Sequence, residues 1–171
     1  MINLDEFIRQ LRANAAAVRA LVEGISAEQA QWKPDADSWS MREVMEHLYN
    51  EERLDFRQHL KEMLSDPPQP WGRFNPEAYL SIKSCGHGLE GFLVERQASI
   101  EWLTALQDVD WDVTIEAVFG PEDEKLIFHA GDVLLSWAEH DILHLRQMIE
   151  LHHAWNENQA APYSLQYAGG W

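Results

Sequence analysis

Cysteine is nearly absent from this 171-residue sequence, which contains only Cys85. One cysteine cannot form a disulfide within the chain, and a lone cysteine without a partner motif is more often inert than catalytic. No apolar run approaches the roughly 18 residues that a membrane-spanning helix needs. The motifs Gly-x-Ser-x-Gly and Cys-x-x-Cys and the phosphate-binding glycine loop are also missing. The sequence therefore does not indicate the common serine-hydrolase, redox or nucleotide-binding classes.

Positive charge is scarce as well. Lysine and arginine number 13 against 29 aspartates and glutamates, which gives a formal net charge of −16. Such a surface repels nucleic-acid phosphates and anionic membranes, so we expect neither as a partner. Residues 1–6 are acidic and amphipathic and lack the basic start of a signal peptide, which predicts a cytoplasmic protein. A hydrophobic content of 46% fits one globular domain spanning 1–171.

Apolar residues recur at three- and four-residue spacing over four long segments, which predicts four amphipathic helices. Ser40 and Glu43 form a capping box before the second helix, and the proline-rich stretch 67–70 ends it. A β-branched and aromatic stretch around Gly120 predicts a small hairpin before the last helix. The predicted fold is therefore all-α, a four-helix bundle with a short extended or β-hairpin excursion. The helices are expected at 3–23, 40–65, 89–107 and 132–156.

Two histidines, His140 and His144, lie four residues apart in the last predicted helix. At about 100° per residue their side chains differ by only about 40° around the helix axis, so two imidazoles can reach one metal ion. Both fall within the apolar arc of that helix, where a buried imidazole needs a partner for its polar nitrogens. A shared metal ion would satisfy both rings. Trp137 and Trp155 lie on the same arc and are expected to pack in the core or to wall a pocket.

A third ligand has to come from another helix. His47 is the best candidate because it borders the apolar arc of the second helix. Glu51 follows one turn later and projects to nearly the same side. The other histidines are weaker candidates and are expected to be exposed: His59, His87, His129, His152 and His153.

The segment from His140 to His144 also has the outline of the His-Glu-x-x-His motif of zinc proteases, with Asp141 in place of the glutamate. Aspartate is one methylene shorter and would misplace the general base, so a protease is not the preferred interpretation. Asp141 is expected instead to face the bundle or to support a neighbouring imidazole.

The segments 39–48 and 137–147 together resemble the DinB-like superfamily, and residues 167–171 look like a tail of some members. The resemblance covers most of the chain. It implies an up-and-down four-helix bundle and a metal ion held by three histidines, one from the second helix and two from the fourth. His47, His140 and His144 match these positions. The family includes metal-dependent hydrolases and thiol-dependent transferases.

Together with the resemblance, these residues favour a metal-dependent enzyme, either a hydrolase or a low-molecular-weight-thiol S-transferase. Three histidines leave coordination positions open for a small-molecule substrate, and both zinc and nickel suit imidazole ligands. Glu51 is the candidate general base, and Gln147 could orient a water or a ligand. The alternative is a non-catalytic metal-binding or stress-response bundle. A homodimer is expected by analogy with the family.

Overall fold

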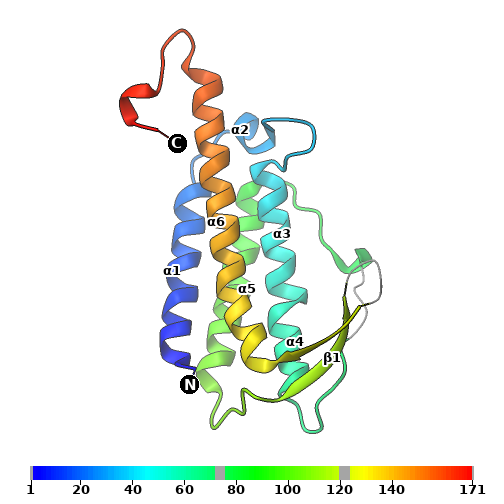
Figure 1. Ribbon diagram of the computed structural model, residues 1–171. Coiled ribbons are helices and arrows are strands. Elements are labelled where there is room, and N and C mark those ends of the chain that lie inside the picture. The colour runs from blue at the N-terminus through cyan, green and yellow to red at the C-terminus, as the bar shows by residue number, and fades with distance from the viewer. Residues whose placement is uncertain (1, 72–75, 120–123, 171) are drawn as a thin grey trace.

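Four long helical segments pack side by side as a bundle in the computed structural model, which describes residues 2–71, 76–119 and 124–170 (Figure 1). The predicted four-helix bundle is confirmed. Its helices are α1 (Leu4–Val22), α3 (Met41–Leu54) with its continuation α4 (Phe56–Met63), α5 (Cys85–Ala105) and α6 (Ala130–Ala160). Shorter elements are α2 (Ala27–Gln31) and the 3-10 turns η1 (Pro76–Ala78) and η2 (Gln166–Ala168).

The direction of the helices differs from a simple up-and-down order. In Figure 1, α1 and α6 run upward, whereas α3 and α5 both run downward. The expected alternation is therefore wrong for α3 and α5, which are parallel and are joined by the long connection 64–84. A parallel pair needs such a connection because the chain must return along the bundle before the next helix can begin.

Local signals set the start of the helix that carries His47. Ser40 Oγ accepts a hydrogen bond from the Glu43 backbone N–H at 3.3 Å, and the Glu43 carboxylate accepts from the Ser40 N–H at 2.7 Å. This is the predicted capping box, and it satisfies two backbone donors that the helix itself leaves unpaired. α3 therefore begins at Met41, close before His47.

The second long helix is interrupted at Asp55, so the continuous helix expected over 40–65 is wrong. Asp55 has a φ of −109° and a ψ of −99°, outside the helical region, and α3 and α4 meet there. Beyond the break, Arg57 donates to the backbone carbonyl of Glu95 in α5 at 2.9 Å, and the two side chains form an ion pair. These contacts hold α4 against α5. Because neither proline nor glycine marks the break, the apolar periodicity alone did not reveal it.

The excursion before the last helix is a two-stranded antiparallel hairpin, as predicted. β1 (Thr114–Phe119) pairs with β2 (Glu124–His129), and Ala117 lies opposite Leu126. The predicted turn at Gly120 lies outside the described residues. The hairpin leads directly into α6, whose first residue Ala130 donates its backbone N–H to the carbonyl of Val113 at 2.9 Å.

The third predicted helix starts earlier than the periodicity indicated, and the fourth extends further at both ends. α5 begins at Cys85, four residues before the expected start at 89, because Ser84 Oγ accepts a hydrogen bond from the His87 N–H at 3.2 Å. α6 extends past both expected ends, 132 and 156, to cover Ala130–Ala160. None of the described helices is apolar over a length that could cross a membrane.

Buried apolar side chains form two clusters, one toward each end of the bundle. A layer of four buried polar residues separates them, and we call it the polar layer: Asn14, Glu52, Arg96 and Asp141. Burial of the apolar clusters supplies the main driving force for folding. The cluster at the end where α1 ends and α3 begins includes Val18, Val44, Leu48, Phe92 and Met148. The cluster at the other end includes Leu11, Leu60, Met63, Leu103 and Trp137.

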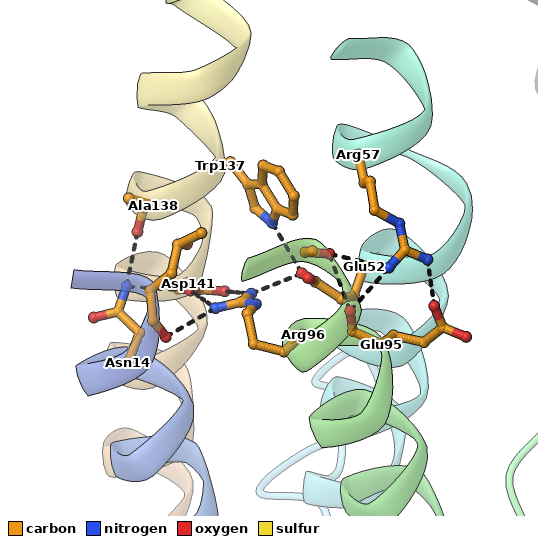
Figure 2. A network of polar contacts seen from close by, with 10 residues as sticks. Asn14, Glu52, Arg57, Glu95, Arg96, Trp137, Ala138 and Asp141 are labelled. Carbon is orange, nitrogen blue, oxygen red and sulfur yellow. Dashed lines mark hydrogen bonds and ion pairs between the residues drawn. The ribbon is translucent and has the colours of Figure 1, made fainter. Parts of the chain in front are cut away.

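Arg96 is the centre of the polar layer (Figure 2). Its guanidinium binds both oxygens of Asp141 in α6, at 2.6 and 2.9 Å, and reaches Glu52 Oε2 in α3 at 2.8 Å. Trp137 Nε1 donates to the same Glu52 oxygen at 2.9 Å, and Asn14 Nδ2 donates to Asp141 at 3.1 Å. One cation in α5 thus links α1, α3 and α6. The expectation that Asp141 faces the bundle is confirmed.

We expect Arg96→Met to lower the free energy of unfolding by about 3–5 kcal/mol, because it leaves the buried carboxylates of Glu52 and Asp141 without their cation. Urea denaturation followed by circular dichroism measures the change. The matched control is Arg12→Met, which removes an exposed arginine of α1 and should cost less than about 0.5 kcal/mol. Equal stability of the two variants would contradict the assignment of Arg96 as the central cation.

Candidate metal centre

Three imidazoles from two helices converge at the level of the polar layer. Nε2 of His47 in α3 lies 3.0 Å from Nε2 of His140 in α6, and Nε2 of His144 lies 3.2 Å from the same atom. One ring nitrogen from each residue falls within 4.8 Å of the other two. Within the described part of the chain, no other set of histidine, cysteine and acidic side chains meets this condition. The structure therefore brings together all three histidines that the sequence singled out.

Burial keeps these rings neutral. Loss of solvent, together with the neighbouring rings of His144 and His140, lowers the pKa of His47 to about 4. Burial likewise lowers the pKa of His140 to about 4 and lowers the pKa of His144. At neutral pH the imidazoles thus carry free lone pairs, which is the form that binds a metal ion.

The residues fit a divalent metal ion. Two nitrogens bound at about 2.0–2.1 Å to one tetrahedral ion lie about 3.3 Å apart. The separations of 3.0 and 3.2 Å to His140 Nε2 are close to that value. A neutral imidazole has one N–H donor and one nitrogen with a lone pair, so three rings that meet through Nε2 cannot all pair with one another by hydrogen bonds. A shared cation can bind the lone pair of every ring. Three protein ligands also leave room for water or substrate.

Gln147 orients one of the three rings. His144 Nδ1 lies 2.8 Å from Gln147 Oε1, an atom that only accepts hydrogen bonds. The hydrogen of His144 therefore resides on Nδ1, which leaves Nε2 free to face the other histidines. Such partners commonly fix the tautomer and direction of metal-binding histidines. Gln147 thus contacts a ring of the cluster, one turn along α6 from it.

Glu51 lies beside the cluster and not within it. Its Oε1 is 3.7 Å from Nδ1 of His47, too far for a hydrogen bond. The same oxygen accepts a hydrogen bond from the hydroxyl of Tyr79, a residue of the connection between α4 and α5. Burial raises the pKa of Glu51, and the Tyr79 hydroxyl partly offsets this. Glu51 is therefore a half-buried carboxyl group held in place next to the three rings.

Aromatic side chains contact all three histidines. Trp39 stacks over His144, with ring centroids 6.1 Å apart and planes 6° apart, and meets His47 edge-on at 5.2 Å. Phe56 packs against the third ring, His140, with ring centroids 5.1 Å apart. Trp137, by contrast, is buried in the core, so the core-packing expectation for it is correct. The aromatic walls explain how rings on the bundle surface are sufficiently desolvated to stay neutral.

A surface pocket of about 510 Å³ adjoins the cluster. Its volume lies in the range of small-molecule sites. His144 belongs to both the cluster and the pocket wall, and Gln147, which contacts His144, also lines the pocket, so a ligand in the pocket lies next to the His144 ring. The described tail after Ala160 contributes no lining residue. The pocket is lined by Pro34, Asp37, Ser38, Trp39, His144, Gln147, Glu150, Leu151 and Ala154.

The remaining histidines were all expected to be exposed, but only some of them are. His87 and His129 are exposed, as predicted. His152 is half-buried and bridges two elements, with Nε2 2.6 Å from the carbonyl of Leu21 and Nδ1 3.1 Å from Gln29 Nε2. The prediction of exposure is wrong for His152, and also for the half-buried His59 and His153. These rings have structural partners of their own, outside the cluster.

Sequence reasoning missed three residues at the site. Trp39 precedes its helix, so helical periodicity does not place it. Tyr79 lies in a connection without any repeating pattern. Asp55 stands at the unpredicted helix break, where its charge partly offsets the lowering of the pKa of both His47 and His140. Of these three residues, only Asp55 has a signal in the sequence, which is its four-residue spacing from Glu51 and His47.

Comparisons with known proteins identify the fold and the family of this chain. YfiT from Bacillus subtilis, described as a probable metal-dependent hydrolase with an unusual four-helix bundle topology, has a solved structure that is similar to this chain. The TM-score is 0.72 at 17% identity, and the match covers 91% of each chain, which establishes the fold. No curated protein matches the sequence. The family model of the DinB superfamily matches residues 10–148, and the chain therefore belongs to the DinB superfamily.

Proposed function

We propose that the protein is a metal-dependent enzyme that acts on a small molecule, as a hydrolase or as a low-molecular-weight-thiol S-transferase. The observation that carries the proposal is the convergence of His47, His140 and His144 beside a pocket that is lined by one of them, His144, and by its partner Gln147. A structural metal site is usually closed by four protein ligands. An open set of three, next to a pocket of small-molecule size, supports catalysis over a purely structural role.

The three histidines would hold a divalent ion, and zinc and nickel both suit three imidazoles. When bound, such an ion polarises a carbonyl oxygen and lowers the pKa of a bound water or thiol. Gln147 holds the tautomer of His144. Trp39 and Phe56 exclude bulk water from the rings. A hydrolase would use a water molecule in the open position, and a transferase would use the thiol. We place this activity in the cytoplasm.

Glu51 is the proposed general base. Its Oε1 lies 3.7 Å from Nδ1 of His47, one turn away along α3, and its raised pKa brings its proton affinity closer to that required at neutral pH. The hydroxyl of Tyr79 fixes the carboxylate by donating to Oε1. The second oxygen of Glu51 is then the one that would take a proton from the attacking water or thiol.

We further propose that the homodimer forms through the exposed face of α6. Leu135, Ile142 and Ile149 recur every seven residues and are 57%, 40% and 44% exposed. With a two-fold axis at Ile142 and the two α6 helices antiparallel, Leu135 of one chain would lie near Ile149 of the other, and Glu139 would lie near Arg146. Such a pairing would match apolar with apolar side chains and opposite charges with each other, as an isologous interface requires.

The dimer is tested by Ile142→Glu, which places two like charges on the axis. We expect sedimentation equilibrium to show a dimer for the wild type and a monomer for the variant, with unchanged helix content. Leu80→Glu is the matched control, because Leu80 is similarly exposed (46%) but lies outside α6. A monomeric wild type would refute the proposed interface.

Metal binding is tested by elemental analysis of protein passed through gel filtration. We expect one divalent ion per chain in the wild type and almost none in His47→Ala, because the two remaining imidazoles on α6 hold an ion far more weakly than three do. His87→Ala removes an exposed histidine outside the cluster and should keep the full equivalent. An unchanged metal content in His47→Ala would show that the ion, if any, binds elsewhere.

The role of Glu51 is tested by Glu51→Gln, which keeps the size of the side chain and removes its basicity. On a panel of esters, amides and thiol–electrophile pairs, we expect turnover to fall about 100-fold or more while the metal content stays at the wild-type level. Tyr79→Phe removes only the hydrogen bond and should cost about tenfold or less. Full turnover by Glu51→Gln would remove this residue from the proposed chemistry.

A further inference from the structure

The pocket beside the histidines has acidic walls. Asp37 and Glu150 line it, and none of its described lining residues is a lysine or an arginine. Arg146 approaches Glu150, with Nε 3.5 Å from Oε1, but these side chains are 71% and 52% exposed, so the pair is weak. Lys33, on the loop of Asp37, is instead paired with Glu43 at 2.8 Å. The pocket therefore presents two carboxylates without an equal number of nearby cations.

The indole ring of Trp39 lines the same pocket. Trp39 lines the pocket and is 41% exposed, although its ring also contacts His144 and His47. The face of an indole attracts cations, most strongly where water is partly excluded. Leu151 and Ala154 supply apolar wall, which suits the carbon atoms that surround an organic ammonium group. Aromatic surface combined with carboxylates is the arrangement that recognises such cations.

The loop that carries these groups is ordered by its own contacts. Asp35 Oδ1 accepts hydrogen bonds from the backbone N–H groups of Asp37 at 2.9 Å and Ser38 at 2.8 Å, and Oδ2 accepts from the Ser38 hydroxyl at 2.9 Å. Just before the loop, Trp32 packs edge-on against Trp155 of α6 with ring centroids 5.6 Å apart. The pocket wall is therefore formed before a ligand arrives, which lowers the entropic cost of binding.

We propose that this pocket binds the positively charged end of the substrate, an organic ammonium group, between Trp39 and the carboxylates of Asp37 and Glu150. The inference rests on the proposed function, since it places the reacting end of the substrate at the three histidines. The substrate class is a cationic small molecule, such as an ester or amide that carries an amine. The net charge of −16 favours the approach of such a molecule and repels anions.

The charge of the pocket distinguishes the two proposed reactions, hydrolysis and transfer to a thiol. Carboxylate-bearing thiols would meet Asp37 and Glu150 as like charges. A cationic ester or amide would meet them as counter-charges. The pocket thus favours hydrolysis of an amine-bearing substrate over transfer to an anionic thiol.

The test is isothermal titration calorimetry with three probes that share a benzyl group: benzyltrimethylammonium, benzyl methyl ether and phenylmethanesulfonate. We expect the cation to bind at least about tenfold more tightly than the neutral ether, and the anion to show no measurable binding. Asp37→Asn and Glu150→Gln should each weaken the cation about three- to tenfold and leave the ether unchanged. Trp39→Leu should weaken both. Glu101→Gln, an equal charge change on an exposed residue outside the pocket, should have no effect.

Three results would overturn the inference: equal affinity for the three probes, an equal loss in Glu101→Gln, or full cation binding in both acidic variants. Metal content is measured on the same samples. A retained metal ion without a preference for the cation would refute this inference alone. A cation preference in protein that binds no metal would refute the proposed function and leave the pocket as an ammonium site.

Discussion

The ion pairs of Arg96 set the register between the two helices that deliver the histidines. Asp141 directly follows His140 on α6, and Glu52 lies five residues after His47 on α3. One guanidinium binds both carboxylates, and its paired contacts with Asp141 tolerate little rotation or sliding. Because α6 cannot turn without disturbing this contact, its two histidines face α3 at a defined height. A fully apolar layer could be equally stable, but it would contain no directional contact between α5 and α6 that fixes the rotation of α6.

The same layer explains why the rings can be both neutral and accessible. Apolar clusters above and below it hold the bundle closed, so the histidines do not have to contribute to the core. They lie at the edge, where Trp39 and Phe56 remove enough water to lower their pKa values. A fully buried site would desolvate the rings more strongly but would admit no substrate. Partial burial by aromatic side chains satisfies both requirements.

The sequence predicted those features that depend on regular spacing. His140 and His144 share a helix face because they are four residues apart, slightly more than one helical turn. The capping box at Ser40 marked the start of the helix that carries His47. Arg96 was not singled out, because an arginine within an apolar stripe usually extends to solvent and its burial depends on two carboxylates from other helices. The break at Asp55 and the position of Trp39 depend equally on tertiary contacts. His152 was misassigned as exposed because its partners on α1 and α2 are more than a hundred residues away along the chain.

The charges at the two ends of the site differ in sign and would orient a charged substrate. Three neutral imidazoles leave the full charge of a bound dication in place, unlike a set containing carboxylates or thiolates. That charge would repel an ammonium group and attract electron-rich atoms such as a carbonyl oxygen. Asp37 and Glu150 line the adjoining pocket, so the ammonium end of the proposed substrate would be stabilised away from the ion while the opposite end would be drawn toward it. Attraction at one end and repulsion at the other would orient a cationic substrate before any specific hydrogen bond forms, because both act at the range of unscreened charges.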